Sequence, residues 1–170
     1  MGRRPAQTSG CFWNTHGRWG AKALKESDLP ETVKAYLSSF LKRTPPVRFS
    51  FIKQARTPSE RISFFIVRCH ESEPLIHRFA LSGYEQLLYV DIAALISGQL
   101  KGGKVVQDDP LFLICTHGAH DKCCAKHGIP SYEALRRAGE EAVWQSSHVG
   151  GRSFRRESGL SSARSLLWTG

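Results

Sequence analysis

The first strong pattern of apolar and polar positions along the chain is helical. It begins after Pro30, whose fixed φ suits the first position of a helix, and it ends at Pro45-Pro46. Between these prolines, apolar residues recur three and four positions apart, as on one face of a helix: Val33, Tyr36, Leu37, Phe40 and Leu41. The pattern predicts one amphipathic helix.

Three segments rich in β-branched and aromatic residues come next, at residues 47–53, 61–69 and 75–81. Each is predicted as a strand. In the first, Phe49 and Phe51 alternate with the polar Arg48 and Ser50. This alternation is typical of a strand with one face buried. In the second, residues 64–67 are a continuous apolar run, which is typical of a strand covered on both faces.

Shorter elements lie on both sides of these strands. Residues 11–13 are predicted as a short strand, and residues 87–90 are a further short apolar run. Asp91 can accept hydrogen bonds from the first N–H groups of a helix over residues 92–97, and Gly98 can adopt the left-handed conformation that ends it.

The last third of the chain has the order strand, helix, strand. A strand over residues 111–114 precedes a helix that Ser131 is expected to cap and that runs to about Glu141, and a strand over residues 142–145 follows. Because strands and helices mix in this way, the pattern predicts an α/β domain with a mixed central sheet flanked by helices. A thioredoxin-like arrangement fits it.

Composition defines the class of protein. A chain of 170 residues, 41% hydrophobic and 23% charged, is expected to form one globular domain with a buried core, preceded by disordered residues 1–10. It has no apolar run of about 20 residues and no apolar segment after its N-terminal arginines, so neither a membrane span nor a secretory signal is predicted. Five cysteines at irregular spacing favour free thiols or a metal site over disulfides, and they indicate the cytoplasm.

The formal net charge of +9 invites comparison with nucleic-acid-binding proteins. Lys and Arg are scattered, however, and no segment combines a basic stripe with interleaved aromatic residues. A moderately basic, solvated surface accounts for the charge, and binding to nucleic acid is not expected.

Candidate chemistry gathers in residues 111–124, with the sequence LFLICTHGAHDKCC. This segment holds three of the five cysteines and two of the seven histidines. Cys115 and Cys124 are separated by eight residues. That is too many for a zinc knuckle of roughly two to four, but it suits a loop that arches over a cluster. His148 opens a second, glycine-rich loop.

The residues by themselves leave two interpretations open. In one, thiolates and histidine hold an iron–sulfur cluster, since histidine can replace thiolates on one iron. In the other, Cys115 is a buried strand residue, and Cys123 and Cys124 are loop thiols. His117 and His120 can bind a cluster or tune it by hydrogen bonds to its sulfurs, and a solvated loop residue is the simpler account of His120.

Two strings, CTHGAHDKCCAKHG and VWQSSHVGG, resemble the sucrase/ferredoxin-like family, as does the earlier HGRWGAKALKESDLP. The resemblance implies a thioredoxin-like ferredoxin domain over residues 11–151 that carries a [2Fe–2S] cluster. It makes Cys115, Cys124 and His148 the cluster ligands and Cys123 a neighbour of the cluster. By residue type and position in the loop, Cys123 and His117 are further candidates for the metal. The residues expected to support these two loops are Gly118, Asp121, Gly150 and Gly151.

The resemblance stops at Arg152. Some family members have a second histidine at this position, and arginine cannot bind a metal because it stays protonated. Residues 152–170 show neither periodicity nor the family pattern. Their codons, read one base along, can encode DRFAANLVYLPHGLYYGR, which resembles the family's continuation. We therefore predict a frameshift after Gly151 that leaves residues 152–170 as an out-of-frame, disordered tail.

These features favour a ferredoxin-like electron carrier that binds a [2Fe–2S] cluster through cysteine and histidine. The frameshift is expected to impair cluster binding in this chain. The alternative is a thiol-redox or zinc-binding module using the same residues. An adjacent cysteine pair in place of Cys-x-x-Cys counts against thiol-redox chemistry, and the lack of paired carboxylates counts against sucrose hydrolysis. We expect a carrier rather than an enzyme, with an unidentified redox protein as its partner and neither a membrane nor nucleic acid.

Overall fold

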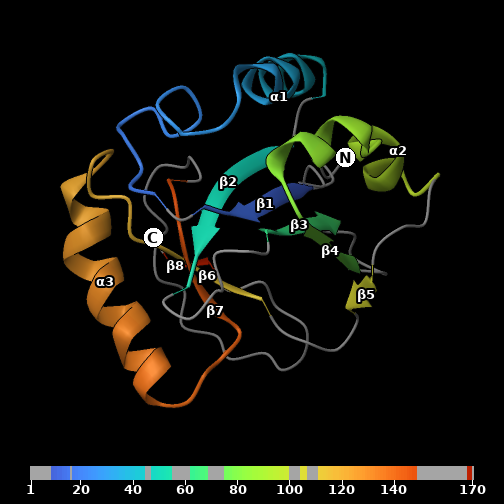
Figure 1. The fold of residues 1–170 in the computed structure, drawn as a ribbon. Helices are drawn as coiled ribbons and strands as arrows, with labels where there is room; N and C mark the ends of the chain where they lie inside the picture. The colour runs from blue at the N-terminus through green and yellow to red at the C-terminus, as the bar shows by residue number, and fades with distance from the viewer. Residues whose placement is uncertain are drawn as a thin grey trace, which may run out of the picture. The chain divides into compact units, whose positions relative to one another are not determined.

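The computed structural model describes residues 9–15, 17–44, 47–54, 62–68, 75–99, 104–106, 111–148 and 168–169 (Figure 1). These residues belong to two compact units, and the chain passes between the units several times. The first unit draws on Met1–Asn14, Asp28–Phe49 and Pro58–Gln107. The second draws on Thr15–Ser27, Ser50–Thr57 and Asp108–Gly170.

The first unit contains antiparallel strands. Those that the structure describes are β1 (Gly10–Asn14), β3 (Ile62–Arg68), β4 (Leu75–Leu81) and β5 (Lys104–Val106), in the order β5-β4-β3-β1. Each neighbouring pair in this order is antiparallel. β3 is buried along most of its length, as its continuous apolar run predicted. The pattern did not predict β5.

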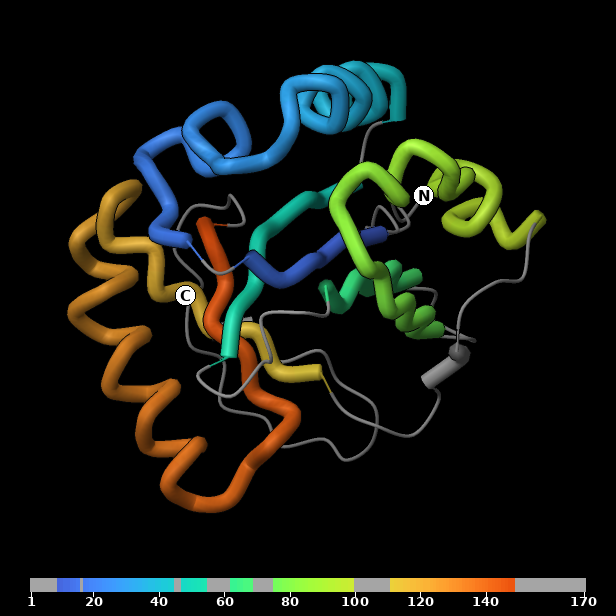
Figure 2. Tube along the Cα trace, viewed as in Figure 1, coloured from blue at the N-terminus to red at the C-terminus, as the bar shows by residue number. Residues whose placement is uncertain are grey.

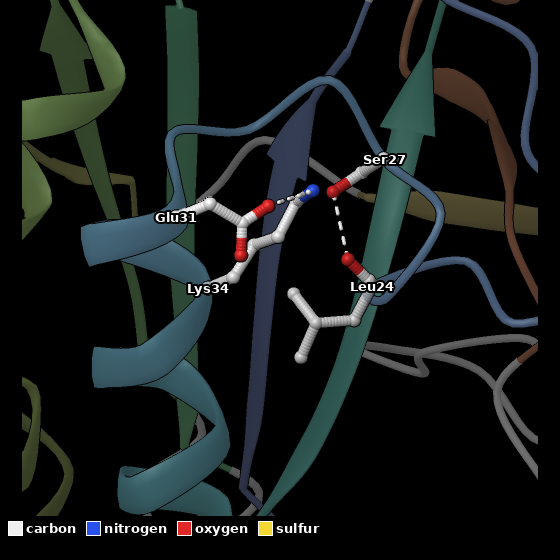
Figure 3. A network of polar contacts seen from close by, with 4 residues as sticks. All are labelled: Leu24, Ser27, Glu31 and Lys34. Carbon is white, nitrogen blue, oxygen red and sulfur yellow. Dashed lines mark hydrogen bonds and ion pairs between the residues drawn. The ribbon is translucent and has the colours of Figure 1, made fainter.

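The amphipathic helix predicted after Pro30 is α1 (Glu31–Arg43). It buries Val33, Leu37 and Phe40. In its first turn the Lys34 ammonium lies 2.9 Å from a carboxylate oxygen of Glu31 (Figure 3). Such a pair on a helix contributes only about 0.3–0.5 kcal/mol, so burial of the apolar face is the larger stabilising term.

Two short helices follow β4. The first is a 3₁₀ helix, η1 (Tyr84–Tyr89), which buries Leu87. The second, α2 (Ile92–Ser97), has the predicted caps. The Asp91 side chain accepts a hydrogen bond from the Ala94 backbone N–H at 2.9 Å, and Gly98 ends the helix with a φ of 79°.

The second unit is built around two parallel strands and the helix between them. β6 (Phe112–Cys115) leads through α3 (Lys122–Arg137) into β7 (Val143–Ser146), as the trace in Figure 2 shows, and β7 pairs in parallel with β6. β2 (Arg48–Lys53) enters this unit at Ser50 and pairs with β7 in the antiparallel direction. The sheet of this unit is therefore mixed.

A small core holds α3 against this sheet. It consists of Ile114 from β6, Tyr132 from α3 and Val143 from β7. The predicted α/β fold, with a mixed sheet and flanking helices, is confirmed, and it is consistent with a thioredoxin-like arrangement. β8 (Trp168–Thr169) pairs in parallel with β6, and the rest of residues 152–170 lie outside the described ranges.

The observed α3 differs from the predicted helix at both ends. Its N-cap is Asp121 rather than Ser131, and it ends at Arg137 rather than about Glu141. The Asp121 carboxylate accepts a hydrogen bond from the Cys123 backbone N–H at 2.9 Å, which is the interaction that an N-cap supplies. The Ser131 hydroxyl instead donates within the helix to the carbonyl oxygen one turn earlier, at 2.9 Å. The local signal at Ser131 therefore did not mark the helix start.

The predicted alternation of β2 is wrong at Ser50, which is fully buried. Its hydroxyl lies 2.9 Å from the Ser147 carbonyl oxygen and 2.8 Å from the Ser147 hydroxyl. The Ser147 hydroxyl also accepts the Phe51 backbone N–H at 3.0 Å. Buried polar groups are tolerated when they are hydrogen-bonded, and this pair satisfies itself across the two strands.

Candidate metal centre

Three side chains that could bind a metal come together at one end of the parallel strand pair. Cys115 is the last residue of β6, and Cys124 lies in the first turn of α3. His148 follows the end of β7, where Ser146 is paired with Cys115. Parallel pairing brings the carboxyl ends of both strands to the same edge, so Cys115 and His148 meet although they are distant in sequence.

The distances among these side chains suit a metal. The Nδ1 atom of His148 lies 3.7 Å from Sγ of Cys124 and 4.0 Å from Sγ of Cys115. All three ligand atoms lie within 4.8 Å of one another. A tetrahedral ion with bonds of about 2.3 Å to sulfur and about 2.0 Å to nitrogen holds those atoms about 3.5 Å apart. The three donors therefore need only small movements to share one metal.

The electrostatics of the triad favour neutral groups while no metal is bound. Burial, together with the neighbouring Cys115 thiol, raises the pKa of Cys124 to about 11. Burial also lowers the pKa of His148, and the nearby His120 and His117 act in the same direction. Cys124 is thus a protonated thiol and His148 a neutral imidazole at neutral pH. A neutral imidazole is the form that binds metals, whereas the thiol must release its proton to a binding metal.

His117, a further candidate ligand from the sequence, is buried beside the triad. The His148 backbone N–H donates to its Nδ1 atom at 3.0 Å, and its Nε2 atom lies 2.8 Å from the Gly20 carbonyl oxygen. Burial lowers the pKa of His117. Backbone groups therefore occupy both ring nitrogens. His117 is in neither of the two groups of described residues that could hold a metal ion.

His120 is exposed, as expected, but it is not isolated. Its ring stacks on that of His148, with centroids 4.1 Å apart and planes inclined by 21°, and its centroid lies 5.6 Å from that of His117. Its Nδ1 atom lies 3.2 Å from the Ala21 carbonyl oxygen. His120 therefore covers one face of the His148 imidazole.

Cys123, the other candidate thiol, is exposed at the start of α3. It forms a second possible ligand group with Asp121 and Cys124. A hydrogen bond to the Asp121 carboxylate raises the pKa of Cys123 to about 11. Asp121 thus both caps the helix and keeps Cys123 protonated. Cys11, Cys115, Cys123 and Cys124 are all free thiols in the part of the chain that the structure describes.

Two glycines allow α3 to lie close to the end of β6 and to the loop that follows it. A Cβ atom at Gly118, an expected supporting residue, would lie 2.7 Å from the Ala125 side chain. A Cβ atom at Gly128 would overlap the Cys115 carbonyl oxygen. Gly128 was not among the predicted site residues. Its position one helical turn after Cys124 could have marked it once the start of the helix was known. Gly150, Gly151 and Arg152 lie outside the described residues.

The loop before α1 forms one wall of the site. Trp19 donates from its indole nitrogen to the Thr15 hydroxyl at 2.8 Å, and its ring meets that of His117 edge-on, with centroids 5.8 Å apart. The Lys53 ammonium lies 4.4 Å from the centroid of the Trp19 ring. Further along, the Ser27 hydroxyl donates to the Leu24 carbonyl oxygen at 2.8 Å (Figure 3). These contacts fix the loop that carries Gly20.

Fold and site together define an α/β protein with a cysteine–histidine group that can bind a metal. The family described as Sucrase/ferredoxin-like matches residues 13–155, and the chain belongs to this family, as the resemblance predicted. No curated protein and no solved structure matches the chain significantly. Among the helices that the structure describes, none is both long and apolar enough to cross a membrane.

Proposed function

We propose that this protein is a ferredoxin-like electron carrier that binds a [2Fe–2S] cluster through Cys115, Cys124 and His148. The observation that carries the proposal is the convergence of two buried thiols and one imidazole within 4.8 Å. Soft thiolate donors are the usual ligands of iron–sulfur clusters, and imidazole is the known substitute on one iron. Membership of the Sucrase/ferredoxin-like family supports the same choice.

The residues of the site suit this role. A bound cluster would supply one-electron chemistry, accepting an electron from one redox protein and passing it to another. Cys115 and Cys124 would hold the cluster where burial keeps water away from the thiolates. His148 is only partly buried and would form the side of the centre nearest to solvent. A neutral histidine ligand in place of a thiolate makes a cluster less negative and raises its potential.

The chain with the proposed frameshift is expected to hold its cluster poorly or not at all. The described residues offer three ligands at one centre, and arginine occupies the position where some family members carry a fourth. The proposed frameshift after Gly151 accounts for this substitution. Resequencing the gene on both strands tests it directly, and an intact reading frame through residues 152–170 would rule it out.

Anaerobic expression tests the cluster itself. The chain and a frame-corrected version are purified side by side, and visible absorption, iron, acid-labile sulfide and zinc are measured. We expect a brown corrected protein with iron and sulfide in equal amounts, beside an original chain with little of either. A colourless, iron-free corrected protein would refute the cluster assignment.

A single zinc ion is the second candidate for this site. The distances of 3.7 Å and 4.0 Å from the His148 nitrogen to the two sulfurs favour it, because they are close to those around one tetrahedral ion. The same metal analysis separates the candidates, since a zinc module contains zinc in place of iron and sulfide. A cytoplasmic location and an unidentified protein partner remain predictions from the sequence.

A further inference from the structure

From the hydrogen bonds around His148 we infer that His117 is a positioning residue for the metal centre and not one of its ligands. The inference rests on the proposed metal site and adds to it the residue that holds the histidine ligand in place. His117 is buried between the loop that carries Gly20 and the loop that carries His148.

The two hydrogen bonds fix the protonation state of the His117 ring. A backbone N–H can only donate, so the Nδ1 atom that receives the His148 N–H at 3.0 Å carries no proton. The proton of the neutral ring is therefore on Nε2, which donates to the Gly20 carbonyl oxygen at 2.8 Å. The ring has neither a lone pair nor a proton left over.

This assignment separates the positioning role from a ligand role. A metal on Nδ1 would displace the His148 N–H, and a metal on Nε2 would require the loss of the proton given to Gly20. Either change would break the link between the two loops. His117 therefore keeps both hydrogen bonds and orients His148, while Cys115, Cys124 and His148 bind the metal.

The link acts on a stretch of backbone that β2 also holds. The Ser147 N–H donates to the Phe51 carbonyl oxygen at 2.8 Å, and the Ser147 hydroxyl accepts the Phe51 N–H at 3.0 Å, so β2 fixes the residue before His148. His117 fixes the N–H of His148 itself. Together they define the direction in which the His148 side chain leaves the backbone, toward the two sulfurs.

The other end of the link is fixed as well. The indole of Trp19, next to Gly20, is bonded to Thr15 and lies edge-on against the His117 ring. These contacts hold the loop, so the Gly20 carbonyl oxygen stays in position to accept the hydrogen bond from Nε2. Through His117, this loop supports a metal ligand that lies far from it in sequence.

Two substitutions at His117 separate its two hydrogen bonds. The Oδ1 atom of an asparagine occupies the place of Nδ1, so His117→Asn keeps an acceptor for the His148 N–H and loses the bond to Gly20. The amide nitrogen of a glutamine reaches the place of Nε2, so His117→Gln keeps the bond to Gly20 and loses the acceptor. His127→Asn, on the exposed side of α3, is the matched control.

The probe is cobalt(II), added anaerobically to the reduced, metal-free full chain. Its absorption bands report which atoms bind the ion, and competition with a chelator gives the affinity. Loss of a group that orients a ligand lowers metal affinity about 10- to 100-fold. We expect unchanged cobalt bands at saturation in both variants. We expect the affinity to fall more in His117→Gln than in His117→Asn, and not at all in His127→Asn.

Other results would overturn the inference. Shifted cobalt bands in both His117 variants would make His117 a ligand. Unchanged affinity in variants with wild-type circular dichroism, or equal losses in the two, would leave it a packing residue. A wild-type chain that binds no cobalt would remove the metal site and this role together.

Nitrogen NMR of the histidine rings is independent of metal binding. It should show His117 protonated on Nε2 both without metal and with zinc. Protonation on Nδ1 would contradict the inference even if the metal site is correct.

Discussion

The thiol sulfur of Cys124, in the first turn of α3, lies 3.7 Å from Nδ1 of His148, which follows β7. Cys123, its neighbour in sequence, points into solvent instead. A helix separates consecutive side chains by about 100° around its axis, so only one of two adjacent cysteines can face the strands. This relationship makes Cys124, rather than the adjacent pair, the partner of Cys115.

The first prediction concerns this choice of thiol. Cys124→Ser should lower the affinity for cobalt(II) or zinc more than about 100-fold, because loss of a ligand costs more than loss of a group that orients one. Cys123→Ser is the matched control and should bind as the wild type does. Chelator competition on both reduced variants measures the difference. An equal loss of metal affinity in the two variants would mean that both adjacent cysteines bind the metal.

The second prediction concerns the close approach of α3 to β6. Gly128→Ala should destabilise the protein by about 1–3 kcal/mol, because the added methyl group overlaps the Cys115 carbonyl oxygen. Urea unfolding measures the change. Ser131→Ala, on the exposed side of the same helix, should stay within about 0.5 kcal/mol of the wild type. A Gly128→Ala variant of unchanged stability would show that the helix can move away without cost.

The third prediction concerns the buried serine pair beside the site. Ser50→Ala removes a hydroxyl that lies 2.9 Å from the Ser147 carbonyl oxygen and leaves that buried oxygen without this partner. Loss of such a partner costs about 1–3 kcal/mol. Urea unfolding should show the loss, and metal affinity should fall with it because Ser147 precedes His148. Unchanged affinity would show that the bonds between Ser50 and Ser147 are not needed to hold His148.

The fourth prediction concerns thiol labelling and metal removal. The exposed Cys123 should react with iodoacetamide with or without metal, although slowly, because the Asp121 hydrogen bond keeps it protonated. The buried Cys115 and Cys124 should react more slowly still in the chelated chain, and a bound metal should abolish their labelling. Cys11 should react only after unfolding, because burial raises its pKa to about 12 and blocks access. Mass spectrometry of the labelled peptides reads out each site. Labelling of Cys11 in the folded, metal-free chain would contradict its burial.

Several elements could be predicted because their signals are local. The strands over residues 48–53, 62–68 and 75–81 were predicted to within a residue or two by β-branched and aromatic composition. Asp91 and Gly98 marked both ends of α2, since capping depends on the residues at those positions. The start of α3 was missed because Pro130-Ser131 also has the pattern of a helix start. Asp121 supplies the cap that the structure uses.

The residue types, their spacing and the family pattern are enough to predict a site made of soft ligands. What each side chain faces depends on segments that only the folded chain brings together. Ser50 is buried because its partner, Ser147, lies on another part of the chain. His117 could serve as a ligand or as a hydrogen-bonding group by composition alone. The backbone groups of Gly20 and His148 occupy both its nitrogens, and contacts between such distant segments exist only in the folded chain.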